Sequence, residues 1–427
     1  MRKLLFAFFA LSCAVAYGKE YQVSSAGEIA SLAPLPGDVV TFADGEYRNC
    51  RINVTFSGTK GAPVVFKAET PGGVRFCGVS SMTIDGRYLD VSGFVFEKPS
   101  GELSVTCLLG SGSRFVKFHD CAFGGDECSM DNRKYTTWLM VKGHGNEVFN
   151  CSFVGKRNKG LMFDVRFNEE TNKVNPSPDE YLAPACLVHN NYFSRPYSRK
   201  NEKGQSVNGQ ESFRIGLSQT SMQNADCRVW DNWFYECDGE IEVISGKCSG
   251  NVYEHNLLEN CSGEITQRHG KNCVFRRNII ISDGRKSSGG IRIIGSGHIV
   301  EENYIEGTGG HAVTAAISVI CGNAETPKLA EYWPAHDCTV RGNVIIGCNE
   351  GIAINAKTAF APAVPPRGLR IERNVLKNCR MAVKVYEGMD WRSVRWRGNH
   401  FEGQQQGCSV KSVKPKAMES NLIVMRR

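Results

Sequence analysis

Residues 239–270 read GEIEVISGKCSGNVYEHNLLENCSGEITQRHG, and this segment repeats itself. Its first tetrapeptide, GEIE at 239–242, is echoed by GEIT at 263–266 and by GGIR at 289–292. The central isoleucines of the three tetrapeptides are 24 and 26 residues apart. A period in the range of about 20–50 residues, with short apolar segments and no helical pattern, is typical of a stacked solenoid.

A second repeat consists of asparagines that are closely followed by apolar residues. Its nine members are Asn150, Asn191, Asn232, Asn256, Asn278, Asn303, Asn343, Asn374 and Asn399. Several spacings are close to 24 residues and others are near 40, as expected when some coils carry an inserted loop. Asparagine tolerates the left-handed backbone conformation, so we expect these residues at the bends. The pattern favours an all-β, single-domain parallel β-helix over a propeller, which needs a longer and regular repeat.

Two carboxylates open the first quoted segment. The alternation of polar and apolar residues from Glu240 to Val243 predicts a half-buried strand, with Ile241 and Val243 packed inward. Glu240 and Glu242 then share one face, where their charges repel unless a cation lies between them. Ca²⁺ takes oxygen ligands of this kind. These two residues alone leave two interpretations open, a calcium site or a solvated glutamate pair on a surface strand.

Stacking of the repeats predicts which side chains meet. Glu242, Thr266 and Arg292 are expected one above another on an outer face, with Lys247 one short turn beyond its strand and Arg268 two residues past Thr266. Acidic and basic groups gathered in one groove suit a site that binds a polyanion.

Several motifs, in order and at compatible spacing, resemble polysaccharide lyase family 6, which includes alginate lyases and the dermatan-cleaving chondroitinase B. The similarity covers nearly the whole mature chain. Its motifs are PGDVV at 36–40, DGEY at 44–47, GKRNKG at 155–160, NGQESFRIG at 208–216, Glu240-x-Glu242 with Lys247, Arg268-His269-Gly270, and GGIRIIG at 289–295.

The resemblance implies a right-handed β-helix and a Ca²⁺-assisted β-elimination. It implies that Asn208, Glu240 and Glu242 are calcium ligands. Lys247 matches the family's Brønsted base, and Arg268 matches its catalytic acid.

Four further residues are candidates for binding substrate. The resemblance places Arg292, His269 and His298 near the groove, where they are expected to bind sugar or carboxylate groups. His144 is a candidate from its own position, in the turn KGHGN at 142–146. For His144 two interpretations stay open, a substrate contact or a turn histidine without a role.

The expected chemistry explains these residue types. Removal of the C5 proton of a uronate builds negative charge on its carboxylate, and a bound Ca²⁺ offsets that charge. Lys247 must be neutral to act as a base, and a neighbouring cation disfavours its charged form. The bond from C4 to oxygen then breaks and leaves a 4,5-unsaturated uronate end. A guanidinium hardly gives up a proton, so the proton donor to the leaving oxygen stays open between Arg268 and another group.

The N-terminus reads MRKLLFAFFALSCAVAYG, which predicts a signal peptide over residues 1–18. Cys13 leaves lipoprotein processing open as a second route. We therefore expect an exported protein, secreted or periplasmic, whose β-helix domain spans 19–427 without a membrane span. Ala26 to Leu32 is expected to form a short capping helix with Ser24 or Ser25 as its N-cap.

Composition agrees with an acidic polysaccharide as the partner. The net charge is +7, and loss of Arg2 and Lys3 with the signal leaves +5. No nucleic-acid motif is present, so we expect no nucleic acid partner, and a monomer or homodimer. The chain has 18 cysteines, and loss of Cys13 leaves 17. Export permits disulfides, but stacked apolar thiols in a β-helix interior explain the cysteines equally well.

Three functions remain open from the sequence. The first is an alginate lyase, and the second is a lyase for another uronate glycan such as dermatan sulfate. The third is a non-catalytic glycan-binding β-helix. The presence of Glu240, Glu242, Lys247 and Arg268 together argues against the third.

Overall fold

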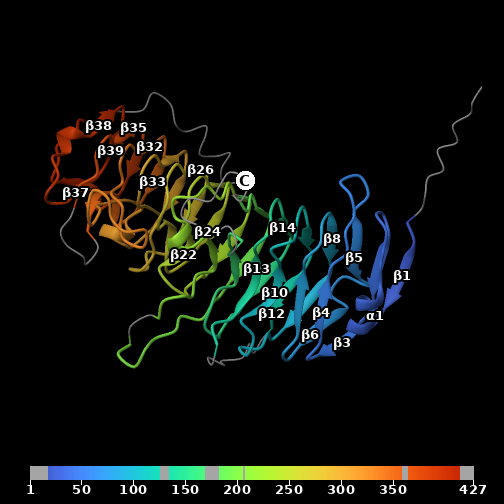
Figure 1. Cartoon of the computed structure of the whole chain (residues 1–427). Coiled ribbons are helices and arrows are strands. Elements are labelled where there is room, and N and C mark those ends of the chain that lie inside the picture. Colours follow the sequence, from blue (N-terminus) through green and yellow to red (C-terminus); the bar gives the residue numbers. More distant parts are fainter. Residues whose placement is uncertain (1–17, 126–133, 169–181, 205–206, 358–363, 414–427) are drawn as a thin grey trace, which may run out of the picture.

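The structure, a computed structural model, describes residues 18–125, 134–168, 182–204, 207–357 and 364–413. Within these ranges the chain winds into coils that each give one strand to each of three parallel sheets, of 14, 13 and 13 strands. Figure 1 shows the coils stacked in sequence order along one axis. The predicted right-handed parallel β-helix is confirmed.

The strands fall into three sheets, here called A, B and C. Sheet A contains β1 (Glu20–Val23), β2 (Val39–Phe42), β5 (Val64–Ala68), β8 (Leu89–Ser92), β11 (Lys117–His119), β14 (Glu147–Phe149), β17 (Leu187–His189), β20 (Arg228–Trp230), β23 (Val252–Glu254), β26 (Val274–Arg276), β29 (Ile299–Glu301), β32 (Thr339–Arg341), β35 (Arg370–Glu372) and β38 (Arg395–Arg397). Sheet B contains β3 (Gly45–Arg48), β6 (Val74–Cys77), β9 (Phe94–Glu97), β12 (Ala122–Gly124), β15 (Ser152–Val154), β18 (Tyr192–Ser194), β21 (Trp233–Tyr235), β24 (Leu257–Glu259), β27 (Ile279–Ile281), β30 (Tyr304–Glu306), β33 (Val344–Ile346), β36 (Val375–Lys377) and β39 (His400–Phe401). Sheet C contains β4 (Arg51–Val54), β7 (Ser81–Ile84), β10 (Val105–Leu109), β13 (Thr137–Val141), β16 (Phe163–Val165), β19 (Phe213–Ile215), β22 (Glu242–Gly246), β25 (Glu264–Gln267), β28 (Ile291–Ile293), β31 (Ile317–Ile320), β34 (Glu350–Ala356), β37 (Met381–Val385) and β40 (Gln404–Gln406).

Helices are few and short. Helix α1 (Ala26–Ser31) lies at the N-terminal end of the stack (Figure 1), where Ile29 is buried and the Ser25 hydroxyl accepts the Glu28 backbone N–H at 3.3 Å. The predicted cap is therefore present. The described residues also contain three 3₁₀ turns, η2 (Ser218–Thr220), η3 (Ala312–Thr314) and η4 (Trp391–Ser393). No helix of the described chain is long and apolar enough to cross a membrane.

Identical positions of successive coils stack inside the helix. The rings of Phe123, Phe153, Phe193 and Phe234 form one such column, with centroids 5.0, 4.8 and 4.6 Å apart. Parallel in-register strands place each apolar side chain above its counterpart, so one sequence repeat becomes one continuous core. The described cysteines are all free, and all but Cys50 and Cys408 are buried. Within the described chain this confirms stacked thiols rather than disulfides.

Eight of the nine predicted asparagines form a buried ladder. Each side-chain amide from Asn191 to Asn374 donates to the Oδ1 of the next asparagine at 2.9–3.1 Å, ending at Asn399. Asn150 is not a member, because the Cys151 backbone N–H occupies that place and donates to Asn191 Oδ1 at 2.9 Å.

The predicted left-handed backbone conformation is present at Asn150 but wrong for the eight asparagines of the ladder. The left-handed residue is the one before each ladder position, as at Asn190, Asp231, His255 and Arg277. The bend is made by that preceding residue, which leaves the ladder asparagine free to turn its amide inward along the stack.

The predicted signal peptide falls almost wholly on residues 1–17, which lie outside the described residues.

Candidate functional site

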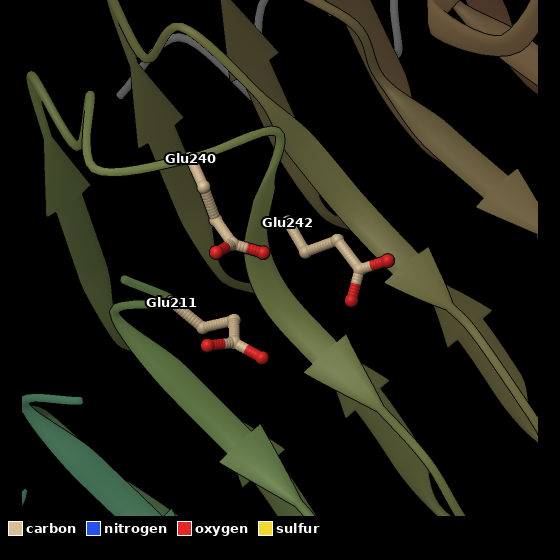
Figure 2. Close-up of side chains that lie close together, drawn as sticks. All are labelled: Glu211, Glu240 and Glu242. Atoms are coloured by element: carbon tan, nitrogen blue, oxygen red, sulfur yellow. The ribbon is translucent and has the colours of Figure 1, made fainter. Parts of the chain in front are cut away.

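Three carboxylates meet where the strands of sheet C begin. Glu211 lies just before β19, Glu240 just before β22, and Glu242 is the first residue of β22. Each residue offers one carboxylate oxygen, and these three oxygens all lie within 4.8 Å of one another (Figure 2). Glu211 is 2% exposed and Glu242 is 8% exposed. Three carboxylates this close together, two of them buried and Glu240 partly buried, repel strongly, so the arrangement fits a hard cation.

The electrostatics of Glu240 reflect this crowding. Burial, followed by the charge of Glu211, raises the pKa of Glu240 to about 8. The backbone N–H groups of Gly209 and Gln210 donate to its Oε2 at 2.7 and 2.9 Å and partly counter that rise. The cluster therefore holds a proton near neutral pH unless a cation replaces it.

The strand that carries Glu242 has a bulge that the sequence repeat concealed. Glu242 pairs with Glu264, and the register shifts before Ile244, so that Ser245 rather than Glu242 pairs with Thr266. Thr266 and Arg292 do pair as predicted. Ile241 is 38% exposed instead of packed inward, while Val243 is buried as expected. The prediction of a Glu242–Thr266–Arg292 stack is wrong, because Glu242 pairs with Glu264, two residues before Thr266, and the bulge shifts the register by one residue more.

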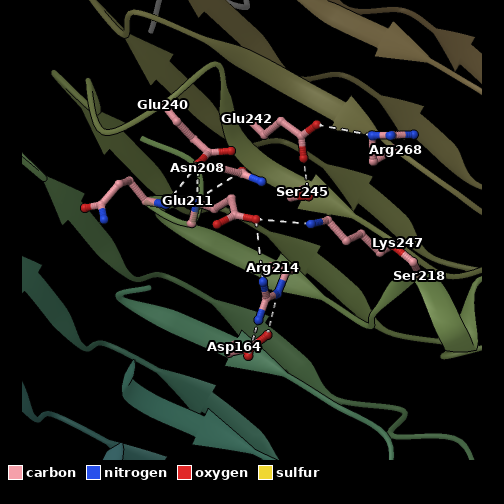
Figure 3. Close-up of polar contacts among 12 residues, drawn as sticks. Asp164, Asn208, Glu211, Arg214, Ser218, Glu240, Glu242, Ser245, Lys247 and Arg268 are labelled. Atoms are coloured by element: carbon pink, nitrogen blue, oxygen red, sulfur yellow. Dashed lines mark hydrogen bonds and ion pairs between the residues drawn. The ribbon is translucent and has the colours of Figure 1, made fainter. Parts of the chain in front are cut away.

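Lys247 follows β22 directly and lies beside the carboxylates. Its Nζ is 3.2 Å from Glu211 Oε1, and the Arg214 guanidinium is 3.6 Å from the same oxygen (Figure 3). Arg214 is itself held by Asp164, which accepts from it at 2.8 and 3.1 Å. Glu211 therefore orients the amine of Lys247, and a buried ion pair orients Glu211.

Arg268 follows β25 and completes the basic side of the site. Its Nε is 3.9 Å from Glu242 Oε1, and its guanidinium lies over the Tyr332 ring, 3.9 Å from the centroid. The Ser245 hydroxyl donates to Glu242 Oε2 at 2.5 Å. Lys247 and Arg268 thus stand next to different members of one carboxylate cluster.

Arg292 lies beneath the carboxylate cluster. It is 4% exposed, with Nη2 3.1 Å from Glu242 Oε1 and Nε 3.2 Å from Glu264 Oε1. Burial raises the pKa of Glu264 to about 8, with Arg292 opposing the rise and Glu242 adding to it. Arg292 acts here as a buried counter-charge to two carboxylates, not as a group open to substrate.

Two of the predicted substrate histidines are buried. His269 is 2% exposed, and its Nε2 is 3.0 Å from the Ser218 hydroxyl. Burial, followed by the charges of Arg268 and Lys247, lowers its pKa to about 2, so the ring is neutral.

His298 lies inside the helix and does not line the groove predicted for it. It is fully buried, its Nδ1 accepts the Cys273 N–H at 3.2 Å, and its Nε2 donates to the Ile294 carbonyl at 3.1 Å. Burial lowers its pKa to about 4. Asn251 makes the same kind of bond to Cys227 in an earlier coil, so His298 replaces an asparagine of an inner ladder.

Asn208 and His144 have different surroundings. Asn208 is exposed in the coil before Glu240 and lies beside Glu240 and Glu211 in Figure 3, as a calcium ligand would. His144 contacts the Ala183 carbonyl at 2.6 Å and the Phe115 ring edge-on, apart from the carboxylates.

Sequence reasoning missed Glu211, Glu264 and Arg214 as parts of the site. Glu211 and Arg214 stand within the motif at 208–216, three and six residues after Asn208, and that motif was their only signal. Glu264 belongs to the tetrapeptide GEIT, whose isoleucine alone was used to define the repeat.

Comparison with known proteins places this arrangement in a family. The family model described as chondroitinase B matches residues 25–411. No curated protein sequence matches the chain significantly. A solved mannuronic acid specific polysaccharide family 6 lyase from human gut microbiota is 26% identical with a TM-score of 0.77, over 96% of this chain and 93% of that one.

Two further solved structures share the fold. The complex of the alginate lyase AlyF-OU02 with G6 has a TM-score of 0.79 at 19% identity, over 95% of this chain and 90% of that one. The family 6 alginate lyase AlyGC has a TM-score of 0.75 at 23% identity, over 90% of this chain but only 52% of its own. This chain thus spans about half the length of AlyGC. Because the family model matches most of its length, the chain belongs to polysaccharide lyase family 6, the chondroitinase B family.

Proposed function

We propose that this protein cleaves a uronate-containing polysaccharide, with alginate as its substrate, by Ca²⁺-assisted β-elimination. The observation that carries the proposal is the contact of Glu211 with both the Glu240–Glu242 pair and Lys247 Nζ, which lies 3.2 Å away. A cation site and a positioned amine in one cluster are what proton abstraction next to a carboxylate requires.

Asn208, Glu211, Glu240 and Glu242 are the residues that would hold the ion. They offer only oxygen ligands, which suits Ca²⁺, and their mutual repulsion supplies the driving force for binding. A bound Ca²⁺ would act as a Lewis acid on the substrate carboxylate and favour loss of the C5 proton.

The protein's own groups perform the proton transfers. Lys247, held by Glu211, takes the proton from C5 as a neutral amine. The C4–oxygen bond breaks as the C4=C5 double bond forms, and the leaving oxygen receives a proton. Arg268, fixed between Glu242 and Tyr332, donates hydrogen bonds to that leaving oxygen as its charge develops. Neutral His269 adds no charge beside Arg268.

Alginate is favoured by the gut lyase described as mannuronic acid specific, which aligns over nearly the full length of both chains. Dermatan sulfate remains the second candidate, because the matching family model is described as chondroitinase B. We also propose export through the N-terminal segment MRKLLFAFFALSCAVAYG.

Ultraviolet absorbance tests the reaction, because only the product carries a C=C bond conjugated to a carboxylate. The protein with calcium is incubated with poly-mannuronate, poly-guluronate and dermatan sulfate in parallel. We expect the fastest rise on poly-mannuronate. A rise on dermatan sulfate alone would replace the substrate, and no rise on any uronate polymer would refute the lyase proposal.

A further inference from the structure

A row of left-handed residues marks the corner between sheets C and A. In most coils this position holds Gly, Asn or Asp, which tolerate a positive φ, as in Gly145, Asp226, Gly250, Asn272, Gly297, Asp337 and Gly368, and one coil has Ala185. Backbone hydrogen bonds run along the row, for example from Gly145 N–H to the Pro184 carbonyl and from Gly250 N–H to the Lys271 carbonyl. The corner is thus a regular structural feature of the stack.

Two coils near the N-terminal end place large aromatic residues at this corner. Tyr88 has φ 49° and Phe115 has φ 55°, and their N–H groups make the same corner bonds. A bulky side chain is strained in this conformation, and Gly, Asn or Asp would relieve the strain. Packing at this corner does not require such strain, because most other coils of the row hold Gly, Asn or Asp there.

The two rings stack on each other, with Phe115 exposed and Tyr88 partly exposed. Their centroids are 5.0 Å apart with planes 16° from parallel, and Phe115 is 44% exposed. A Cβ on Gly145 would lie 2.7 Å from the Phe115 ring, so the next coil leaves room for that ring. Exposed aromatic surface kept at the cost of backbone strain points to a ligand.

The rings lie in a groove of about 450 Å³ with apolar walls and a basic rim. Pro63, Leu89 and Leu187 line it, and the exposed Lys60 and Lys117 stand at its edge. This composition, an apolar platform with a few charged groups, is that of a small-molecule or sugar subsite.

The charge around the groove is positive. Arg87 and Arg114 directly precede the two aromatic residues and are stacked through a backbone bridge. Burial, followed by the charge of Arg87, lowers the pKa of Arg114. An anion bound beside this pair would relieve their repulsion.

The acidic groups that face the groove are already paired with histidines of sheet A. Asp90 lies 2.8 Å from His119, and Glu147 lies 3.1 Å from His189. The lining of the groove thus holds two lysines and two carboxylates, and each carboxylate already contacts a histidine.

Three basic residues and one glycine lie in a row between the candidate active site and this groove. Lys247, Gly216, Arg166 and Lys142 occupy equivalent positions directly after β22, β19, β16 and β13, as the strand registers and their hydrogen bonds show. The corner at Phe115 is four coils from the corner after Lys247, which is about 19 Å at the usual strand spacing.

We propose that Tyr88 and Phe115, with Lys60, Lys117, Arg87 and Arg114 around them, form a second binding site for the acidic polysaccharide, remote from the reacting sugar. The exposed edges of the stacked rings contact the sugar units, and the basic groups bind uronate carboxylates. One polymer chain then contacts both sites and gains affinity through effective concentration, whereas a short oligomer contacts only one. The identity of the polymer rests on the proposed function, but the existence of the site does not.

Binding is measured in the Lys247→Ala background, so that the polymer stays intact. The test variant adds Tyr88→Asn and Phe115→Asn, because asparagine removes the rings yet tolerates the left-handed backbone. Its melting temperature establishes that the fold is kept. Trp233→Thr is the matched control, since Trp233 is another exposed aromatic residue, on the outer face of sheet B.

Dissociation constants are measured for long poly-mannuronate and for a trisaccharide. We expect the double asparagine variant to bind the polymer at least about tenfold more weakly, with the trisaccharide and the Trp233→Thr control unchanged. Polymer affinity within about twofold of the parent would overturn the proposal. Self-association of the parent that is lost in the variant, with glycan affinity unchanged, would also overturn it and assign the rings to a dimer interface.

The same experiment separates this proposal from the lyase proposal. The binding panel includes poly-guluronate, dermatan sulfate and neutral dextran. Ring-dependent binding of an acidic polymer, when the wild-type protein cleaves no polymer of the panel, would support the second site and refute the lyase function. Cleavage of a polymer, when removal of the rings weakens the binding of no polymer, would support the lyase function and refute the second site.

Discussion

Glu211 is the residue on which both halves of the candidate chemistry depend. It contributes an oxygen to the carboxylate cluster and holds Lys247 Nζ at 3.2 Å. Its own position is set by Arg214, which Asp164 anchors from the preceding coil. A single carboxylate therefore couples the cation site to the base.

Replacing this carboxylate should weaken both functions together. In Glu211→Gln, which keeps the size of the side chain, we expect the calcium concentration for half-maximal rate to rise at least about tenfold. We expect the rate at saturating calcium to fall as well, because Lys247 loses its charged partner. Calcium titration of the initial rate after chelation measures both effects.

Glu259→Gln is the matched control, because Glu259 lies on the outer face of sheet B. Its calcium dependence should equal that of the wild type. Full activity of the wild type in chelator, or an unchanged calcium response in Glu211→Gln, would remove the calcium assignment.

Most of the chemical residues could be predicted from the sequence, because motifs are read residue by residue. Glu240, Glu242, Lys247 and Arg268 do lie together, and Asn208 lies beside them. Burial is what motifs do not reveal. Arg292 stands in a matching motif and His298 three residues after it, yet His298 replaces a ladder asparagine and Arg292 neutralises Glu242 and Glu264 from below.

Among the structural elements, the asparagine ladder joins residues that are far apart in the sequence. The Asn256 amide donates to the Val229 carbonyl and to Asn278 Oδ1, and its Oδ1 accepts from both N–H groups of Asn232. Every rung satisfies buried backbone groups of the neighbouring coil. The ladder therefore fixes the register in which the coils stack.

Breaking one rung should lower stability without touching the site's side chains. Asn256→Ala removes the acceptor of the buried Asn232 backbone N–H and the amide donor to the Val229 carbonyl, which costs about 1–3 kcal/mol for each buried group left without a partner. Thermal unfolding followed by tryptophan fluorescence measures the loss. Asn53→Thr, at an exposed position of β4, should leave the melting temperature unchanged. Equal melting temperatures of the two variants would contradict a structural role for the ladder.

A second column, on the outer face of sheet A, makes stability depend on pH. The rings of His119, Phe149, His189 and Trp230 stack in succession at 4.5, 5.1 and 4.2 Å. Burial disfavours the charge of His119, but hydrogen bonds to Asp90 and Asp120 outweigh it and raise its pKa to about 9.

The raised pKa has a definite sign for stability. A histidine charged more readily in the folded state stabilises fully below its unfolded pKa of about 6.5, and this contribution is lost as pH rises through about 9. We expect the difference in stability between wild type and His119→Gln to shrink by about 1–2 kcal/mol from pH 6 to pH 10. Denaturant unfolding at a series of pH values measures it. A difference that stays constant over that range would refute the assignment of charge to His119.

Repeat lengths could be predicted for these elements, but local irregularities could not. The spacing of 24 between Ile241 and Ile265 suggested equivalent positions, yet Ile244 pairs with Ile265. The bulge in β22 accounts for one of these three residues, and the other two arise because the coil is shorter than the isoleucine spacing suggests. Nothing in an isoleucine spacing reveals either change.

For the whole molecule, the stack turns sequence order into spatial order. Residues near 90, 115, 145 and 250 lie along one corner, so the N-terminal coils can extend a binding surface that begins at Lys247. A solenoid suits a polymeric substrate for this reason, since each added coil lengthens the surface.

The proposed reaction depends above all on Lys247 as the base. We would follow ultraviolet absorbance with poly-mannuronate and calcium for wild type and Lys247→Ala, and measure polymer binding for both. We predict a rise for the wild type, a rate at least about 10²-fold lower for Lys247→Ala, and similar binding by the two. Lys377→Ala, on sheet B, should match the wild type. An undiminished rate in folded Lys247→Ala would contradict the mechanism at its first step.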